Sequence, residues 1–170
     1  FMTSTLQQSA SSLLGFSASR TMQSAQRLYE GVMTHKGSMG VITYMRTDSL
    51  NIAKIAQDEA RKLIAKTYGK EYVPSKPKVY TTKAKGAQEA HEAIRPTLMD
   101  FTPQIAAQYL KGDELKLYTL IYKRFFASQM QDAEFELQNL WIQSDVALLK
   151  AGGRKLVFDG FYRVLGNEDK

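Results

Sequence analysis

The chain has 170 residues, which is enough to bury a substantial core and suits one domain, or one domain with part of another. Its 44% hydrophobic and 24% charged residues are typical of a globular protein, and the absence of cysteine excludes disulfides, thiolate nucleophiles and zinc-thiolate sites. No apolar run approaches the ~20 residues that cross a bilayer, and the start lacks the pattern of a signal peptide. We therefore expect no membrane partner and favour a reducing, cytoplasmic compartment.

The net charge of +6 is unevenly distributed along the chain. Residues 1–100 contain 14 Lys and Arg against 8 Asp and Glu, whereas residues 101–170 contain 9 basic and 9 acidic residues. A polyanion such as nucleic acid would explain a basic first half, because its phosphates bind Lys and Arg and release counterions. The alternative is that these charges only keep protein faces solvated, as they do in many soluble proteins.

Two helices joined by a short turn are predicted at the start of the chain. Apolar residues at helical spacing predict a helix over 5–14 that Gly15 ends, and Ser17 is a natural cap for a second helix through Tyr29. This pattern is typical of a helix-turn-helix, although a plain structural hairpin of helices is commoner. The predicted inward residues are Leu6, Ala10, Leu13, Leu14, Met22, Ala25 and Leu28, and the exposed polar ones on the second helix are Arg20, Gln23, Gln26 and Arg27.

Residues 31–40 contain three glycines and show no periodicity, so they predict a flexible loop in which His35 is exposed. A short strand over 41–46 follows. Tyr44 and Arg46 lie two positions apart, which places both side chains on one face of a strand. A phenol can attack phosphorus and a guanidinium matches phosphate oxygens, so chemistry on a phosphodiester is conceivable. The alternative is an ordinary half-buried strand that ends in a turn.

A third helix is predicted over 52–68, capped by Asp48, Ser49 or Asn51 and ended by Gly69. The stretch from there to residue 86 is a basic loop, which either connects elements in solvent or lies along a phosphate backbone; its one-sided charge favours the second. Its lysines are Lys70, Lys76, Lys78, Lys83 and Lys85.

His91 lies in a short polar segment that ends at Pro96. A zinc-protease pattern would need a second histidine four residues later, where Arg95 stands, so we expect no zinc site. A lone histidine is more often a surface or core residue than a catalytic one.

Helices are predicted over 103–111 and 113–131, separated by Gly112, with Tyr118 and Tyr122 as packing residues. Residues 133–149 have the pattern of a strand with a bulge at 138–139, followed by a hairpin turn at 151–154. Two further strand segments, 156–158 and 161–165, complete the chain.

Three strings resemble segments of bacterial type IA DNA topoisomerases, in the right order and spacing. Residues 41–49 resemble the active-site segment with Tyr44 at the position of the nucleophile, residues 1–8 resemble the opening of the same domain, and residues 88–97 resemble the histidine segment. The resemblance covers residues 1–97 and weakens beyond, and residues 31–40 resemble a loop insertion of some members. Because the likeness begins at residue 1 without an initiator methionine, we expect a piece of a longer protein.

The resemblance implies an α+β fold, with an α-rich winged-helix-like (catabolite-activator-like) domain over 1–132 and part of a β-rich arch over 133–170. It implies that the intact enzyme cleaves one DNA strand through a 5′-phosphotyrosine, passes a second strand and reseals the cut, which relaxes negative supercoils without ATP. Tyr44, Arg46 and His91 would be the catalytic residues, and Asp48 would orient Arg46 or, as we favour, cap the next helix. The implied DNA contacts are Gln8, Arg20, Gln23, Arg27, Asp48, Lys83, Lys85 and Arg95.

One departure from the family pattern limits these expectations. The family binds Mg²⁺ with a glutamate and an Asp-x-Asp-x-Glu cluster in another domain, and no such cluster occurs in this sequence. We therefore expect Mg²⁺ ligands outside the chain, mainly single-stranded DNA as partner, a nucleoid location in a bacterial cytoplasm, and no relaxation by the chain alone. The alternatives are a stand-alone helix-turn-helix DNA-binding module with Tyr44 in its core, and a protein-interaction domain.

Overall fold

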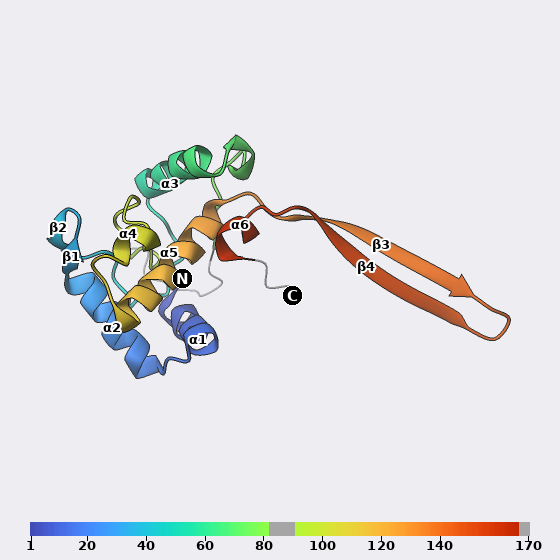
Figure 1. Cartoon of the computed structure of the whole chain (residues 1–170), viewed down its shortest axis with the longest axis horizontal. Helices are drawn as coiled ribbons and strands as arrows, with labels where there is room; N and C mark the ends of the chain where they lie inside the picture. Colours follow the sequence, from blue (N-terminus) through green and yellow to red (C-terminus); the bar gives the residue numbers. More distant parts are fainter. Residues whose placement is uncertain (82–90, 167–170) are drawn as a thin grey trace.

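A computed structural model describes residues 1–81 and 91–166. Figure 1 shows a helical body from which one long two-stranded hairpin projects. The mixture of helices and strands confirms the predicted α+β class. The helices are α1 (Thr3–Leu14), α2 (Ala18–Glu30), α3 (Lys54–Thr67), α4 (Pro103–Ala106), α5 (Gly112–Gln129) and α6 (Tyr162–Leu165), with a 3₁₀ turn η1 (Lys70–Tyr72). The strands are β1 (Val32–Thr34), β2 (Gly37–Met39), β3 (Glu134–Gln143) and β4 (Leu148–Phe158).

The first two helices form as the sequence predicts. Gly15 ends α1 with a left-handed φ of 67°, a conformation that costs glycine little, and its N–H donates to the carbonyl of Ser11. The Ser17 hydroxyl accepts from the backbone N–H of Arg20 and so caps α2. The predicted inner face is confirmed at Leu6, Ala10, Ala25 and Leu28, which are fully buried, and is wrong at Leu13, which is 60% exposed.

Helix α5 is the centre of the core and packs against α1, α2, α3, α4 and α6. Its tyrosines are packing residues, as predicted. The hydroxyl of Tyr118 donates to the carbonyl of Phe101 at 2.7 Å, and that of Tyr122 donates to the carbonyl of Met99 at 2.9 Å. Burial raises the pKa of both phenols far above the ordinary value, so neither is available as a nucleophile.

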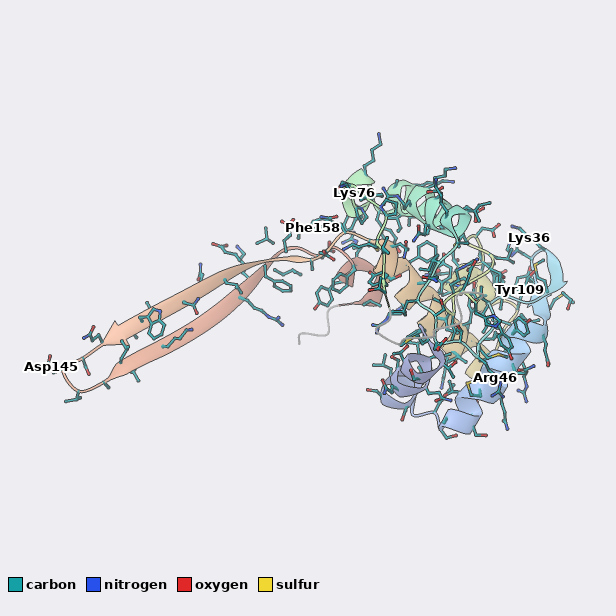
Figure 2. The ribbon with its side chains drawn as sticks, turned by 180° about the vertical axis from the view of Figure 1, so that it is seen from behind. Lys36, Arg46, Lys76, Tyr109, Asp145 and Phe158 are labelled. Carbon is teal, nitrogen blue, oxygen red and sulfur yellow. The ribbon has the colours of Figure 1, made fainter. Side chains whose placement is uncertain are left out.

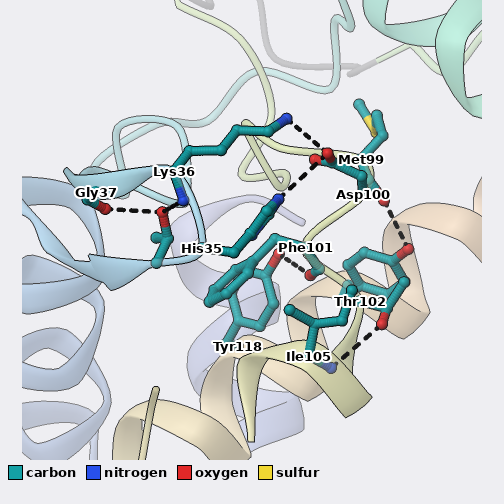
Figure 3. Close-up of polar contacts among 11 residues, drawn as sticks. His35, Lys36, Gly37, Met99, Asp100, Phe101, Thr102, Ile105 and Tyr118 are labelled. Carbon is teal, nitrogen blue, oxygen red and sulfur yellow. Dashed lines mark hydrogen bonds and ion pairs between the residues drawn. The ribbon is translucent and has the colours of Figure 1, made fainter. Parts of the chain in front are cut away.

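The prediction of a flexible loop over 31–40 is wrong, because β1 and β2 pair there as an antiparallel hairpin. The Thr34 hydroxyl donates to the carbonyl of Gly37 and closes a two-residue turn at His35 and Lys36. Figure 3 shows both turn side chains on Asp100, at 3.3 Å from His35 Nε2 and 2.6 Å from Lys36 Nζ. The hydrogen bond from Lys36, with a smaller contribution from His35, lowers the pKa of the Asp100 carboxyl.

His35 is exposed, as predicted, but it lies in the hairpin turn and has partners. Its ring stacks on that of Phe101, with centroids 5.6 Å apart and planes 19° from parallel. The hairpin is thus attached to the segment that leads into α4, whose first turn is capped by the Thr102 hydroxyl.

Helices α3 and α4 differ from their predicted bounds. Helix α3 begins at Lys54 after Ala53, with no side-chain cap, so the predicted caps are wrong. The Ser49 hydroxyl instead accepts from the N–H of Asn51 and makes a local turn. Helix α4 ends at Ala106 rather than at 111, and Gly112 is the first residue of α5 rather than a separator.

The projecting hairpin corrects three predictions about residues 133–165. Strands β3 and β4 pair from Glu134↔Phe158 to Gln143↔Leu148, and the irregularity lies at 134–135 rather than at 138–139. The turn lies at residues 144–147, because the Ser144 hydroxyl accepts from the N–H of Val146 and of Ala147. The predicted turn at 151–154 lies inside β4, and the predicted strand 161–165 contains the helical turn α6.

The contact between residue 40 and α2 yields a stability prediction. A Cβ built on Gly40 would clash with the carbonyl oxygen of Tyr29, and because this oxygen belongs to the backbone, relieving the clash would shift the end of α2. We expect Gly40→Ala to lower the free energy of unfolding by ~2 kcal/mol or more, measured by urea titration. Gly153→Ala is the matched control, because its Cβ would meet no atom within 4 Å. Equal losses for the two variants would contradict the predicted clash.

Candidate active site

The segment 40–49, which carries the predicted nucleophile, is irregular and bends at Met45 and Arg46 instead of forming the predicted strand. Its only sheet-like pairing among the described residues is an isolated bridge between Ile42 and Pro96. Exposure nevertheless alternates along it, because Tyr44, Arg46 and Asp48 are exposed whereas Met45 and Thr47 between them are buried. Tyr44 and Arg46 are therefore both accessible, although the strand that was predicted to align them is absent.

The start of α1 holds this backbone in place. The Thr3 hydroxyl donates to the carbonyl of Met45 at 2.7 Å and accepts from the N–H of Thr47 at 2.9 Å. The Thr3 N–H also donates to the carbonyl of Thr47 at 2.9 Å. These bonds fix the buried side of the segment to the core, and so Tyr44 and Arg46 are presented outwards from rigid backbone.

The histidine segment is bound to the same backbone on the other side. The Thr43 hydroxyl donates to the carbonyl of Ala93 at 2.7 Å and accepts from the N–H of Arg95 at 2.9 Å. The Thr43 N–H donates to the carbonyl of Arg95, also at 2.9 Å. One threonine next to Tyr44 thereby brings residues about fifty positions away, His91 among them, to the nucleophile.

The Tyr44 ring lies between two other rings. The ring of His91 is 5.6 Å away, centroid to centroid, at an interplanar angle of 40°. The ring of Tyr29, from the end of α2, is 5.3 Å away in an edge-to-face arrangement of 62°. Tyr44 itself is 37% exposed, so its ring is supported while part of it faces solvent. Sequence reasoning missed Tyr29, and the only available signal was an aromatic side chain at the exposed end of a polar helix.

Arg46 lies beside the outer face of α2, on the body and far from the hairpin tip at Asp145 (Figure 2). It helps to line a hollow of about 540 Å³. No hydrogen bond or ion pair of its guanidinium is found among residues 1–81 and 91–166. The other residues that line the hollow are Ser19, Met22, Gln23, Gln26, Arg27 and Glu30.

Two of the predicted DNA-binding arginines are exposed but already paired. Arg20 makes a two-bond contact with Asp113 at 2.6 and 2.7 Å, and Arg27 Nη1 is 2.8 Å from the Glu114 carboxylate. Both acids lie in the first turn of α5, where carboxylates are favoured by the helix dipole. The carboxylates raise the pKa of both guanidinium groups, so the arginines stay charged.

The structure places the remaining predicted residues as follows. Arg95 is only 13% exposed at its side chain, and its guanidinium donates to Glu92 and to the carbonyl of Pro96. Gln8 and Asp48 are exposed, and within the described ranges the Asp48 carboxylate contacts neither Arg46 nor a helix N-terminus. Lys83 and Lys85 lie outside the described residues.

A magnesium site was expected elsewhere than in this chain. In the part of the chain that the structure describes, no three His, Asp or Glu side chains are grouped so that they could hold a metal ion. Residues 1–81 and 91–166 therefore do not fit a Mg²⁺ site, and the roles of Tyr44, Arg46 and His91 are derived from their own side chains.

None of the helices in residues 1–81 and 91–166 is long and apolar enough to cross a membrane.

Comparisons with known proteins identify the family of the chain. A model of the DNA topoisomerase family matches residues 1–170. The DNA topoisomerase 1 of Campylobacter jejuni is 64% identical over the whole chain, and that of Helicobacter pylori strain 26695 is 66% identical. The chain spans about a quarter of these relatives, 24% and 23% of their lengths.

The structural comparison gives the same result. The full-length topoisomerase I of Thermotoga maritima superposes with a TM-score of 0.85 at 45% identity, covering 99% of this chain and 27% of that one. Since both the family model and the solved structure match the chain from end to end, the chain belongs to the bacterial DNA topoisomerase family.

Proposed function

We propose that the chain is the tyrosine-bearing part of a type IA topoisomerase, in which Tyr44 cleaves and reseals one strand of DNA. The observation that carries this proposal is the placement of an exposed Tyr44 against His91, with an exposed Arg46 two residues away in the sequence. The names of the relatives agree with this activity, and DNA is then the substrate. The proposed outcome in the intact enzyme is relaxation of negative supercoils.

The proposed reaction exchanges one phosphodiester for another. The Tyr44 oxygen attacks the scissile phosphorus and loses its proton, a bond from that oxygen to phosphorus forms, and the bond from phosphorus to the 3′ oxygen breaks. The leaving oxygen takes up a proton and becomes a 3′-hydroxyl, and the 5′ end stays on the tyrosine. The reverse reaction reseals the strand, and since the number of phosphoester bonds is unchanged, no ATP is needed.

The neighbouring side chains have separate proposed roles. Arg46 would bind the phosphoryl oxygens on which charge accumulates in the transition state. His91 would position the phosphate or transfer a proton at the leaving or attacking oxygen. Asp48 would orient Arg46 when DNA is bound, since it does not cap α3.

Several features of the intact enzyme remain part of this proposal. The Mg²⁺ ligands would lie outside this chain, in an acidic domain that completes the site, and the chain alone would not relax DNA. Residues 1–132 would form the winged-helix-like catalytic domain, residues 133–170 part of the arch, and the enzyme would work on mainly single-stranded DNA in the bacterial cytoplasm. Gln8, Arg20, Gln23, Arg27, Arg95, Lys83 and Lys85 would contact that DNA.

A chimeric enzyme tests the proposed function. In it, this chain replaces the matching quarter of the Campylobacter jejuni relative, whose 64% identity makes the exchange conservative. We expect the chimera to relax negatively supercoiled plasmid and to form a covalent complex with single-stranded oligonucleotide in denaturing gels. DNA binding without covalent complex or relaxation would instead support a stand-alone helix-turn-helix module and would overturn the proposal.

The ion pairs on α2 predict how the isolated chain binds DNA. We expect the isolated chain to bind single-stranded DNA with an affinity that falls steeply as the salt concentration rises. The affinity should be weak, because Arg20 and Arg27 are partly neutralised by Asp113 and Glu114. Asp113→Asn with Glu114→Gln should strengthen binding several-fold and steepen the slope of log affinity against log salt by up to ~1.4, since two arginines become free for phosphate. Fluorescence anisotropy at several salt concentrations measures both quantities.

The control must change the net charge equally. Glu136→Gln with Asp145→Asn removes two exposed carboxylates from the projecting hairpin and should leave the affinity and the slope nearly unchanged. If the two double variants behave alike, the effect is one of net charge and α2 is not the DNA-binding face.

A further inference from the structure

The hollow between α2 and Arg46 combines Arg46, which has a role in the proposed reaction, with several groups of α2 that have no role in the chemical step. Its polar groups are two carboxamides (Gln23 and Gln26), two guanidinium groups (Arg27 and Arg46) and one hydroxyl (Ser19), and Met22 adds an apolar surface. Carboxamides match the polar edges of bases, guanidinium groups match phosphates, and an apolar surface suits the face of a base. A nucleotide combines all three requirements, whereas an acidic peptide would leave the carboxamides and the thioether without a role.

Several polar groups in the hollow have donor or acceptor atoms that remain available to hydrogen-bond a ligand. Arg27 uses one nitrogen, Nη1, on Glu114, and Gln26 uses its amide nitrogen on the carboxylate of Glu30 at 2.5 Å. The carbonyl of Gln26 has no such contact in the described ranges, and neither do the side chains of Gln23 and Arg46. The two guanidinium groups against the single carboxylate of Glu30 give the lining a net charge of +1.

The position of the hollow relative to Tyr44 identifies which nucleotide it would take. Arg46 lines the hollow and is two residues from Tyr44 in the sequence. Tyr29, which contacts the Tyr44 ring, is next to Glu30, another lining residue, at the end of α2. The lining of the hollow therefore includes sequence neighbours both of Tyr44 and of the ring that contacts it.

We propose that this hollow binds the nucleotide on the Tyr44-linked side of the cut, the first one that follows the scissile phosphate. This inference rests on the proposed function, because it needs the 5′ end to stay on Tyr44. That end is tethered to the segment of Arg46, so a site on the same rigid body holds it in register for resealing. The released 3′ end needs a different site, which this chain does not have to supply.

Photo-crosslinking in the chimeric enzyme tests the assignment. An oligonucleotide carries 5-iodo-2′-deoxyuridine either immediately after or immediately before the scissile phosphate, and the crosslinked peptides are identified by mass spectrometry. We expect the first probe to crosslink to residues 19–30, with Met22 as the principal acceptor, and the second probe to crosslink elsewhere. Crosslinks of the first probe that lie only outside residues 19–30 would overturn the inference.

A double-mutant cycle provides a second, independent measurement. An abasic site immediately after the scissile phosphate should weaken binding to the chimera about 10-fold, and Gln23→Ala with Gln26→Ala should weaken binding to normal DNA by a similar factor. Combined, the two changes should weaken binding little more than either alone, because both remove the same contact. Fully additive losses would show that the base lies elsewhere.

The controls separate this inference from the proposed function. Gln104→Ala with Gln108→Ala removes two exposed carboxamides that do not line the hollow and should not alter the cycle. Tyr44→Phe removes the covalent complex if the proposed function is right. A covalent complex on Tyr44 with crosslinks outside α2 contradicts only the hollow, whereas a covalent complex that survives Tyr44→Phe contradicts the proposed function itself.

Discussion

Tyr44→Phe in the chimeric enzyme is expected to abolish covalent attachment of DNA, by about 10⁴-fold or more in the cleavage rate. The substitution removes only the nucleophilic oxygen. The ring contacts with Tyr29 and His91 remain, because phenylalanine has the same ring, and the buried anchors at Met45 and Thr47 are untouched. Covalent complex with 5′-labelled and 3′-labelled oligonucleotides on denaturing gels measures the loss, and unchanged urea unfolding shows that the fold persists.

Other tyrosines serve as matched controls for this loss. Tyr29→Phe removes a hydroxyl from the exposed neighbouring ring and should retain most of the covalent complex. Tyr118→Phe and Tyr122→Phe each remove a buried hydrogen bond, which should cost ~1 kcal/mol of stability without preventing attachment. Covalent complex that persists in Tyr44→Phe and maps to another tyrosine would show that the nucleophile is misassigned.

The parts of the fold that the sequence predicted are those fixed by local chemistry. Gly15 and Ser17 end and begin helices through their own backbone and hydroxyl bonds, so their neighbours in the sequence suffice to predict them. The burial of Ala25 and Leu28 follows from helical spacing for the same reason, whereas Met22, which was predicted to face inward, is half-buried and lines the hollow. Tyr44 and Arg46 are both exposed, although the predicted strand does not form and the backbone bends between them.

The wrong predictions concern turns, where small residues have more than one use. Gly152 and Gly153 have the composition of a hairpin turn, yet they lie in β4 opposite Asn139 and Gln138. The actual turn is closed by a backbone bond from the Ser144 N–H to the Ala147 carbonyl and by the Ser144 hydroxyl, and a serine is a weaker sequence signal than a glycine pair. Glycines at 31, 37 and 40 likewise indicated a loop, whereas they flank or lie within a hairpin attached to Asp100.

The long-range part of the site depends on contacts that spacing cannot give. His91 approaches Tyr44 because the Thr43 hydroxyl bonds to Ala93 and Arg95, fifty and more residues later. The pairing of Arg20 with Asp113 spans 93 residues. Only the resemblance to a known family indicated that His91 lies near Tyr44. Nothing in the sequence indicated the ion pair between Arg20 and Asp113, which changes the charge that α2 offers to DNA.

Replacing Arg46 and replacing His91 in the chimera are expected to impair DNA cleavage in different ways. A phosphate ligand at position 46 must be both charged and forked, so Arg46→Lys keeps the charge and loses the two-bond geometry, while Arg46→Ala loses both. Single-turnover cleavage should accordingly fall in the order wild type, lysine, alanine, with the alanine variant slower by ~10²–10³-fold. Arg46 has no ion pair within the described residues that its removal would break, so stability should be unaffected.

Replacement of His91 should instead change the way in which the cleavage rate depends on pH. An imidazole can donate a proton from one nitrogen and accept one at the other, so proton transfer through His91 would make the cleavage rate depend on pH. His91→Gln keeps a hydrogen-bonding group beside Tyr44 but cannot transfer a proton, and we expect it to slow cleavage by ~10²-fold and to flatten the pH profile. Arg46→Lys should be slower at every pH yet keep the wild-type profile. If His91→Gln has the rate and profile of wild type, His91 only supports the Tyr44 ring, and if Arg46→Ala cleaves normally, the placement of an exposed Arg46 two residues from Tyr44 has no catalytic meaning.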